Sequence, residues 1–336
     1  MDRPWKHSYS DLVDEALVRI REQGAEGMLD LGAETKMQNR LNRDYMDKLS
    51  FEMRILNSAR ADISTTLLGY ELPSPIITCQ WCEYRLMNAT VGSQAYIPEV
   101  ARAIAEVGAL MQLTVQPEYL QEIVEIPGAR IISIFTAYHT SRGSEDQLIE
   151  FTIRDAEERG AIAVGVDMNC FYGEKVGDEW PYQIPQAAKT VEQMRRYRES
   201  TDLPFIVNGV LSVQDARICL EEIGADALGV GHNFGEAVDY AVPVLKILPE
   251  IRESFPDAVL IADTGFMRGT DVLKALALGA DAVAMLEPFM LAYIAEGGEG
   301  VVEMYRVLCD ELRRTMSLTG CTDVASIDPS ILHHLH

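Results

Sequence analysis

The sequence predicts one (β/α)8 barrel with an N-terminal helical extension, on three observations. Eight short apolar runs recur along the chain, and amphipathic segments separate them, so that strands and helices alternate. The chain has 336 residues, which accommodates one barrel of about 250 residues and an extension but no second full domain. We therefore expect the extension at residues 1–70, the barrel at 71–320 and a C-terminal tail at 321–336.

Two segments of the extension predict helices. Asp11–Arg21 and Met37–Leu49 carry apolar residues at helical spacing, and Ser10 stands where a serine caps the first helix. We expect both helices to lie against the barrel as a lid or plug.

The eight apolar runs follow the extension, and each predicts a strand. They are Ile76–Thr78, Leu110–Leu113, Arg130–Phe135, Ala161–Val166, Phe205–Val207, Ala227–Val230, Val259–Ala262 and Ala282–Met285. Amphipathic segments between them, which predict helices, include Pro98–Glu106, Glu145–Glu158, Val213–Glu222 and Asp271–Leu278. A weak repeat places Gly-Ala before three of the strands, because the glycine ends the preceding helix.

Composition excludes several kinds of partner. The net charge of -23 and the pI near 4.6 argue against nucleic acid and anionic membranes, because binding to a duplex requires clustered Lys and Arg. No apolar stretch approaches the roughly 20 residues of a membrane span, and the first residues lack the apolar core of a signal peptide. We expect a cytoplasmic protein whose six cysteines are free thiols.

The stretch 261–285 predicts a strand, a ligand-facing loop, a helix and a further strand. Groups that follow the strands of such a barrel form its active face. Asp263, Gly265, Arg268 and Glu287 are therefore site candidates.

Three matches point to one family. The chain reads Gly-Thr-Asp-Val at 269–272 and Lys-Ala-Leu-Ala-Leu-Gly-Ala at 274–280, it has Leu-Leu-Gly at 67–69 before Pro75, and it has LPFIVNGVLSVQDA at 203–216. From about residue 28 onward it resembles the flavin-dependent α-hydroxy-acid oxidase and dehydrogenase family. The resemblance implies a barrel oxidoreductase that binds FMN, acts on a small molecule and forms a homo-oligomer.

The resemblance also implies a phosphate site that this chain has altered. The arginine that holds the flavin phosphate in the family corresponds to Met267, and the arginine of a Gly-Arg pair after the last strand corresponds to Glu287. A carboxylate there repels a phosphate dianion by roughly 1 to 4 kcal/mol. The backbone N–H groups of Gly265 and Gly269 remain to cradle an anion. Arg268 is either the nearest replacement charge or a solvated surface arginine.

The redox positions implied by the resemblance are altered too. The family's lysine beside the flavin corresponds to Asn208, its histidine base to Asn233, and the arginine that clamps a substrate carboxylate to Glu236. His232 lies one residue before the base position, so it acts as an acid or base only if a bulge or altered loop redirects it, and otherwise it is a buried structural histidine. Glu236 repels a 2-hydroxy acid anion, so we expect a neutral, cationic or metal-bound substrate.

Further positions implied by the resemblance contact the flavin or the substrate. The flavin contacts, besides those already named, are Thr78, Cys79, Thr114 and Ser133. The substrate contacts, besides Glu236, are Phe135 and Lys175. His139 is a further candidate, because its loop follows the third strand and lies over the predicted mouth of the barrel. The polar character of the loop residues among them has a second explanation, which is that surface loops are exposed to water.

A divalent metal ion is an alternative to the flavin. Oxygen and imidazole groups at or just past the strand ends could converge on one ion, namely Asp167, Asn169, Asn208, His232, Asp263 and Glu287. The alternative is that these groups form hydrogen bonds to the loop backbone and to one another. Cys79, Cys82 and Cys170 either bind zinc, run a thiol cycle or are small buried residues.

Three functions remain open. The first is a divergent flavin oxidoreductase of this family whose substrate is not a simple 2-hydroxy acid anion. The second is a flavin-free lyase, isomerase or hydrolase that uses His232 and strand-end carboxylates, with or without a metal. The third is a non-catalytic relative kept as a binding or assembly subunit. In either enzyme we expect the catalytic groups among Asp167, Asn208, His232, Asn233 and Asp263.

Overall fold

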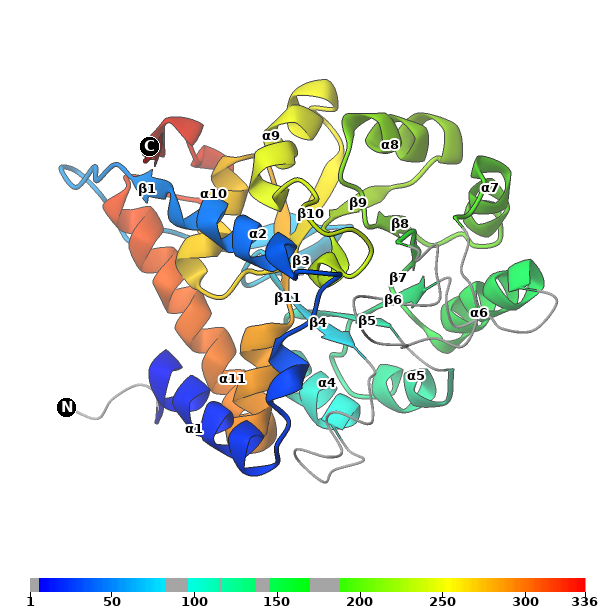
Figure 1. The fold of residues 1–336 in the computed structure, drawn as a ribbon, viewed down its shortest axis with the longest axis horizontal. Coiled ribbons are helices and arrows are strands. Elements are labelled where there is room, and N and C mark those ends of the chain that lie inside the picture. Colours follow the sequence, from blue (N-terminus) through cyan, green and yellow to red (C-terminus); the bar gives the residue numbers. More distant parts are fainter. Residues whose placement is uncertain (1–5, 82–95, 115–116, 137–144, 170–187, 336) are drawn as a thin grey trace.

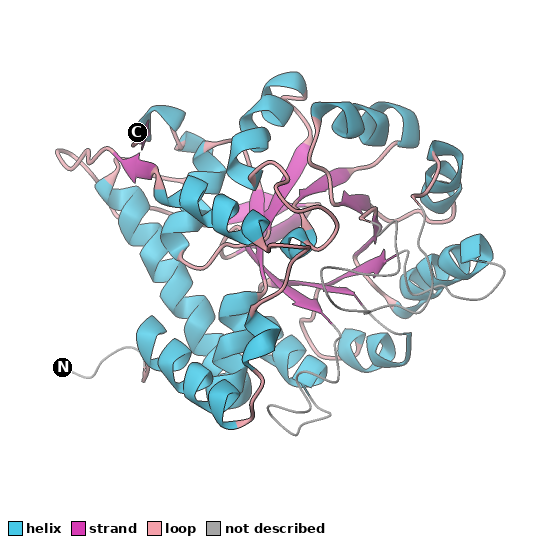
Figure 2. Ribbon diagram, viewed as in Figure 1, coloured by secondary structure: helices cyan, strands magenta, loops and turns pink. Residues whose placement is uncertain are grey.

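A computed structural model of the protein describes residues 6–81, 96–114, 117–136, 145–169 and 188–335. Eight parallel strands close into a barrel in the order β10-β11-β4-β5-β6-β7-β8-β9, and helices surround them (Figures 1 and 2). The predicted (β/α)8 barrel is thus confirmed. In the described ranges, none of the helices combines the length and the apolarity needed to cross a bilayer.

Each barrel strand overlaps one predicted apolar run. The strands are β4 (Ile76–Trp81), β5 (Leu110–Thr114), β6 (Ile131–Thr136), β7 (Ala163–Asp167), β8 (Phe205–Asn208), β9 (Ala227–Val230), β10 (Val259–Asp263) and β11 (Ala282–Met285). The helices around them are α4 (Tyr96–Val107), α5 (Pro117–Val124), α6 (Glu145–Arg159), α7 (Val191–Glu199), α8 (Val213–Arg217), α9 (Val244–Ser254), α10 (Gly269–Ala277) and α11 (Glu287–Leu318).

One predicted helix changes its winding. The segment expected to be helical over Val213–Glu222 is α-helical only to Arg217 and continues as a π-helical turn, η3 (Ile218–Ile223). Gly224 ends it with a φ of 80°, a left-handed conformation that glycine adopts without a steric cost.

The extension consists of two helices and short strands. They are α1 (Tyr9–Glu22), η1 (Glu26–Leu29), α2 (Met37–Asp47), β1 (Leu49–Phe51), β2 (Thr65–Leu67) and β3 (Tyr70–Leu72). The cap of α1 is Ser8 and not Ser10, because Ser8 Oγ accepts from the Asp11 N–H while the Asp11 carboxylate accepts from the Ser8 N–H. In the tail, β12 (Leu332–His334) pairs antiparallel with β1.

Two apolar layers cover the two sides of the barrel strands. Ile77, Ile206 and Ile261 belong to the layer inside the barrel. Alternate positions, such as Val207 and Val283, pack outward in the larger cluster beneath the helices. Because side chains alternate along a strand, this division also decides which polar residues at the strand ends face inward.

A buried ion pair ties α2 to the barrel. Arg43 donates from both terminal nitrogens to the Asp271 carboxylate on α10, each bond 2.9 Å long. Burial alone would raise the pKa of Asp271, but the hydrogen bonds and charge of Arg43 hold it below its usual value. Lys274, on the same helix, donates to the Met46 carbonyl at 2.8 Å. These polar contacts fix where α2 crosses the barrel.

We expect Arg43→Ala to lower the free energy of unfolding by about 3 kcal/mol, because it removes both guanidinium hydrogen bonds from the buried Asp271 carboxylate and leaves the nearest described cation, Lys274 Nζ, 4.0 Å away. Urea denaturation followed by circular dichroism measures the change. Since the pKa of Asp271 is depressed in the folded protein, the deficit should shrink as the pH falls below about 4. Arg306→Ala is the control, because it removes an exposed pair with Glu106 at 3.2 Å and should cost less than about 1 kcal/mol. Equal losses in the two variants would contradict the role given to Arg43.

Candidate active site

Five polar or ionisable side chains face inward at the carboxyl end of the barrel. They are Cys79 on β4, Gln112 on β5, Asp167 on β7, Asn208 on β8 and Asp263 on β10. Each lies an even number of residues from an inner-layer residue of its own strand, as Asn208 does from Ile206 and Asp263 from Ile261. The carboxyl ends of the parallel strands meet at one rim, so residues from distant parts of the chain gather there.

Glycines on β9 and just beyond it leave room for these side chains. A Cβ on Gly229 would lie 2.2 Å from Asn208 Oδ1. A Cβ on Gly231 would lie 3.0 Å from the Cβ of Asp263. Asn208 on β8 and Asp263 on β10 therefore occupy space that side chains at these two glycine positions would otherwise fill.

Three carboxyl groups lie within electrostatic reach of one another at this end. Glu287, the first residue of α11, interacts with Asp263, which also interacts with Asp167. Burial, reinforced by this repulsion, raises the pKa of Asp263 and that of Glu287 to about 7. Burial raises the pKa of Asp167 to about 6, although two hydrogen bonds of 2.9 Å from Asn169 oppose the shift. Burial and the three carboxylates raise the pKa of the Cys79 thiol well above its usual value.

Two buried amides at the same end each present an acceptor without a donor. Asn208 is 8% exposed and Gln112 is 3% exposed. Within the described ranges, Asn208 Oδ1 and Gln112 Oε1 have no hydrogen-bond partner, whereas Gln112 Nε2 lies 3.7 Å from Cys79 Sγ. An unmet buried acceptor costs about 1 to 3 kcal/mol. Such acceptors at the inward end of a barrel indicate a ligand that donates hydrogen bonds.

His232 and Asn233 lie in the turn after β9. His232 has a ψ of 19°, and Asn233 has a left-handed φ of 44°, so the backbone leaves the extended conformation here. The prediction that His232 acts as an acid or base assumes such a departure from extended backbone. The imidazole is 3% exposed, and burial lowers its pKa to about 4, so it is neutral at pH 7 and accepts protons only weakly. Its catalytic role stays a prediction, as do those of Asn233 and the half-buried Glu236.

The carboxylate of Glu311 occupies the start of α10. It accepts from the Gly269 N–H at 2.9 Å and from Arg268 Nε at 3.1 Å, and it pairs with a second guanidinium nitrogen. The Asp271 carboxylate accepts from the N–H groups of Met267 and Arg268. Arg268 also lies 3.9 Å over the Tyr9 ring and lines a surface pocket of about 240 Å³. All three N–H groups from residue 267 to 269, and the arginine, are thus bonded to carboxylates of this chain.

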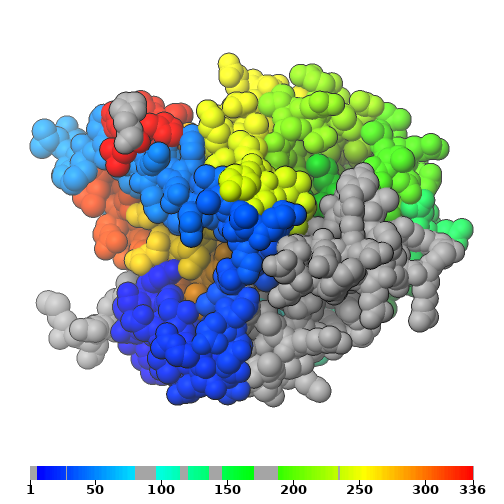
Figure 3. Space-filling view, viewed as in Figure 1, coloured from blue at the N-terminus to red at the C-terminus, as the bar shows by residue number. Residues whose placement is uncertain are grey.

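Asn42 of α2 covers Gly265, the other glycine expected to cradle an anion. A Cβ on Gly265 would lie 2.6 Å from Asn42 Nδ2, which donates to the Thr264 carbonyl at 3.1 Å. The other side of the amide accepts from the Val244 N–H at 3.0 Å. Figure 3 shows the extension spread across this face, beside the segment that follows β9.

Strand alternation places three other predicted contacts on the outer side of the barrel. Phe135 belongs to the outer apolar cluster, and Thr78 and Ser133 occupy outward positions of their strands. The structure therefore does not bring them to the inward-facing group. His139, Lys175, Cys82 and Cys170 lie outside the described residues, as does the side chain of Thr114.

The metal alternative finds no support in the described part of the chain. No three His, Cys, Asp or Glu side chains there are arranged to hold one ion. Asp167, Asp263 and Glu287 interact across space without converging, and His232 does not join them. Cys219, Cys309 and Cys321 are buried free thiols, as expected of packing residues.

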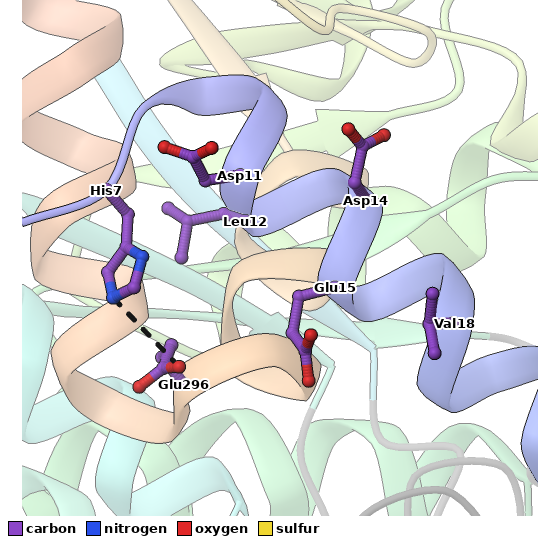
Figure 4. Close-up of a pocket in the computed structure, with 7 residues that line it drawn as sticks. All are labelled: His7, Asp11, Leu12, Asp14, Glu15, Val18 and Glu296. Atoms are coloured by element: carbon purple, nitrogen blue, oxygen red, sulfur yellow. Dashed lines mark ion pairs between the residues drawn. The ribbon is translucent and has the colours of Figure 1, made fainter.

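A pocket of about 420 Å³ lies away from the barrel strands, between α1 and the break in α11 near Glu296 (Figure 4). His7 Nε2 lies 4.0 Å from a Glu296 carboxylate oxygen there, and Asp11, Asp14 and Glu15 add further carboxylates. None of its lining residues belongs to a barrel strand, so it is separate from the inward-facing group.

Comparison with known proteins settles the family. The family model for FMN-dependent dehydrogenases matches residues 19–175 and 172–334. The chain belongs to this family. Glycolate oxidase 1 of Zea mays is 28% identical over 334 residues, which cover 88% of this chain and 87% of that protein. Glycolate oxidase 3 of Arabidopsis thaliana is 28% identical over 330 residues, with 88% of each protein covered.

Solved structures of the same family share the architecture. A mandelate oxidase with 3,3-difluoro-2-hydroxy-3-phenylpropionic acid matches with a TM-score of 0.80 and 25% identity, and the match covers 98% of each chain. A flavocytochrome b2 mutant with pyruvate bound matches with a TM-score of 0.83 at 22% identity, over 96% of this chain and 85% of that one, and shows the fold alone. The family inferred from the motif at 269–280 is confirmed.

The residues of this FMN-dependent dehydrogenase relative do not fit the phosphate of FMN. Met267 offers no charge, Glu287 is a carboxyl group and Arg268 is held by Glu311. The amides at the start of α10 are bonded, and Asn42 covers the neighbouring loop. The unpartnered amides of Asn208 and Gln112 are able to hydrogen-bond a polar ring, but Asn208 stands where the resemblance places a lysine, so both ends of the implied cofactor site are altered.

Sequence reasoning missed two residues of this site. Gln112 was included within an apolar run, although a lone amide at an inward strand position was a signal that could have identified it. Asn42 lies in the amphipathic extension, and nothing local marks it as a contact of a loop more than two hundred residues away.

We expect Asp263→Asn to stabilise the protein by about 2 kcal/mol at pH 8 and to change little at pH 4. The folded-state pKa of Asp263 is raised, so above pH 4 the unfolded chain ionises more readily and wild-type stability falls as the pH rises toward 7. Urea denaturation at both pH values measures this difference. Asp257→Asn, at an exposed turn, is the matched control and should stay within about 0.5 kcal/mol of wild type. A variant less stable than wild type at pH 8 would contradict the assignment.

Proposed function

We propose that the protein is an oxidoreductase of the FMN-dependent dehydrogenase family whose substrate is a small neutral or cationic molecule. Its relatives are named for glycolate and mandelate, which are anions of 2-hydroxy acids. An acidic active site is the wrong electrostatic complement for such an anion. We therefore propose that the family's usual carboxylate substrate has been lost.

This proposal rests on the negative charge at the carboxyl end of the barrel. Asp167, Asp263 and Glu287 interact there through space. Basic side chains on the neighbouring helices are engaged elsewhere, Arg43 by Asp271 and Arg268 by Glu311. A carboxylate that entered would meet like charges without a compensating arginine among the described residues, and such a juxtaposition costs several kcal/mol.

The same carboxyl groups suit proton transfer near neutral pH. A general acid or base is most effective when its pKa lies near the working pH. The pKa of about 7 for Asp263 and that of about 6 for Asp167 meet this condition. We assign Asp263 as the group that holds or releases the substrate proton, with Asp167 modulating its charge. Because the phosphate of FMN does not fit, we assign no step to the flavin.

A flavin-free enzyme is the second candidate, and the same two carboxyl groups favour it. A lyase, isomerase or hydrolase needs an acid and a base but no electron acceptor. An absorbance scan of the purified protein, together with turnover assays with and without added FMN, separates the candidates. Turnover that is independent of FMN supports the second.

We expect glycolate, lactate and (S)-mandelate to be oxidised about 10³-fold more slowly than their neutral amides, because like charges at the site cost about 4 kcal/mol. The measurement is reduction of an artificial dye acceptor with FMN supplied in excess. Each acid and its amide form a pair of matched shape. Brisk oxidation of the acids would refute the proposed substrate class.

Restoring arginine at the two phosphate positions should restore FMN binding. We expect the double variant Met267→Arg/Glu287→Arg to bind FMN about 100-fold more tightly than wild type, since each charged hydrogen bond contributes about 1.5 to 3 kcal/mol. Quenching of flavin fluorescence measures the affinity. Riboflavin, which lacks the phosphate, should gain little, and Glu253→Arg on the exposed face of α9 controls for net charge. Wild-type binding as tight as that of the variant would show that the phosphate site is intact.

A further inference from the structure

We propose that the carboxyl end of the barrel binds an organic cation, a protonated amine or amidinium, as its substrate headgroup. The inference rests on the proposed function and narrows its substrate class. The cation lies among Asp263, Glu287 and Asp167, with its N–H groups donating to the carboxylates and to the two inward amides.

The hydrogen-bonding character of the site supports a ligand with several donors. When ionised, its carboxylates only accept, and the unpartnered oxygens of Asn208 and Gln112 are acceptors as well. Both amides are more than nine-tenths buried and stand at inward positions, Gln112 on β5 and Asn208 on β8, with β6 and β7 between them in the barrel. A ligand that satisfies such a set carries several N–H groups and a positive charge, which describes an ammonium or amidinium.

The spacing of the acids argues for an extended cation and against a metal ion. Within the described ranges no three acidic, histidine or cysteine side chains converge on a common point. Yet Asp263 feels the charges of both Asp167 and Glu287. Acids that interact electrostatically without forming a common coordination site suit a headgroup of several atoms, because a metal ion needs its ligands within about 2.6 Å.

Among the described residues, the basic side chains of α2 and of the start and first turns of α10 do not balance the charge of these acids. Arg268 is paired with Glu311, Arg43 is paired with Asp271, and Lys274 donates to the Met46 carbonyl. A bound cation would supply the missing counter-charge. It would also donate hydrogen bonds to the buried acceptors. One ligand therefore explains both the unbalanced negative charge and the unpartnered amide oxygens.

The titratable groups that face Asp263 define the pH dependence. They are Glu287 at the start of α11, Asp167 on β7 and Cys79 on β4. Tyr9 of α1 lies within electrostatic reach of Glu287, and His232 lies in the turn after β9. Cys79, His232 and Tyr9 are neutral near pH 7, because burial raises the pKa of the first and third and lowers that of the second. A cation binds the ionised form of the acids, so its affinity rises with pH and its binding releases protons.

Calorimetric titration of the full-length protein tests the proposal with three probes of one shape, the cation benzamidine, the neutral benzamide and the anion benzoate. At pH 8 we expect benzamidine to bind at least about tenfold more tightly than the other two. At pH 6 its affinity should fall by about tenfold, since each unit of pKa shift corresponds to a factor of ten. Titration in buffers of different ionisation enthalpy should show proton release.

Two variants and a control locate the site. Asp263→Asn and Glu287→Gln should each weaken benzamidine binding by at least about tenfold and flatten its pH dependence, whereas Glu253→Gln on exposed α9 should leave it unchanged. Thermal unfolding confirms that the variants are folded, and pH dependence in the wild type tests the proposal without any variant. Equal binding of benzamidine and benzamide, pH-independent affinity, or full binding by both variants would overturn the proposal. Brisk oxidation of 2-hydroxy acids would instead overturn the proposed function, so the two failures are distinguishable.

Discussion

Closure of the eight-stranded sheet is the constraint on which this site depends. In a closed barrel every second side chain of each strand points into a packed interior, and a polar group placed there must find a neighbour or a ligand. The inner layer is apolar as far as Ile206 and Ile261, and the next inward positions are Asn208 and Asp263. The change from apolar to acidic within two residues marks where the interior ends and the ligand site begins.

The acidic end is held at a cost to stability. Asp263 and Glu287 repel one another in a setting that already disfavours their charged forms, which is why the pKa of each is raised to about 7. Hydrogen bonds such as that from the Thr264 N–H to Asp263, at 2.6 Å, offset only part of that cost. Perturbed carboxyl groups of this kind gather at functional sites, because a group tuned for a ligand or a proton is seldom also optimal for folding.

The N-terminal extension takes part in the same rearrangement. On α2, Arg43 binds Asp271 at the start of α10, while its neighbour Asn42 covers Gly265 and bridges to α9. Glu311 accepts from the Gly269 N–H at that helix start. A place where the family would hold a phosphate has become an internal contact between the extension and the barrel. The anion that the helix end attracts is supplied by the chain itself.

The sequence by itself determined the barrel, the family and the acidic residues at the strand ends. Apolar runs with intervening amphipathic segments are local patterns, and the motif at 269–280 is contiguous, so both are visible in one dimension. Only the tertiary structure decided that Gln112 faces inward and Ser133 outward, that Glu311 engages Arg268, and that Asn42 lies over Gly265. Those outcomes depend on strand register and on contacts between residues far apart in the chain. The pKa of each carboxyl group depends in turn on the burial and neighbours that such contacts create.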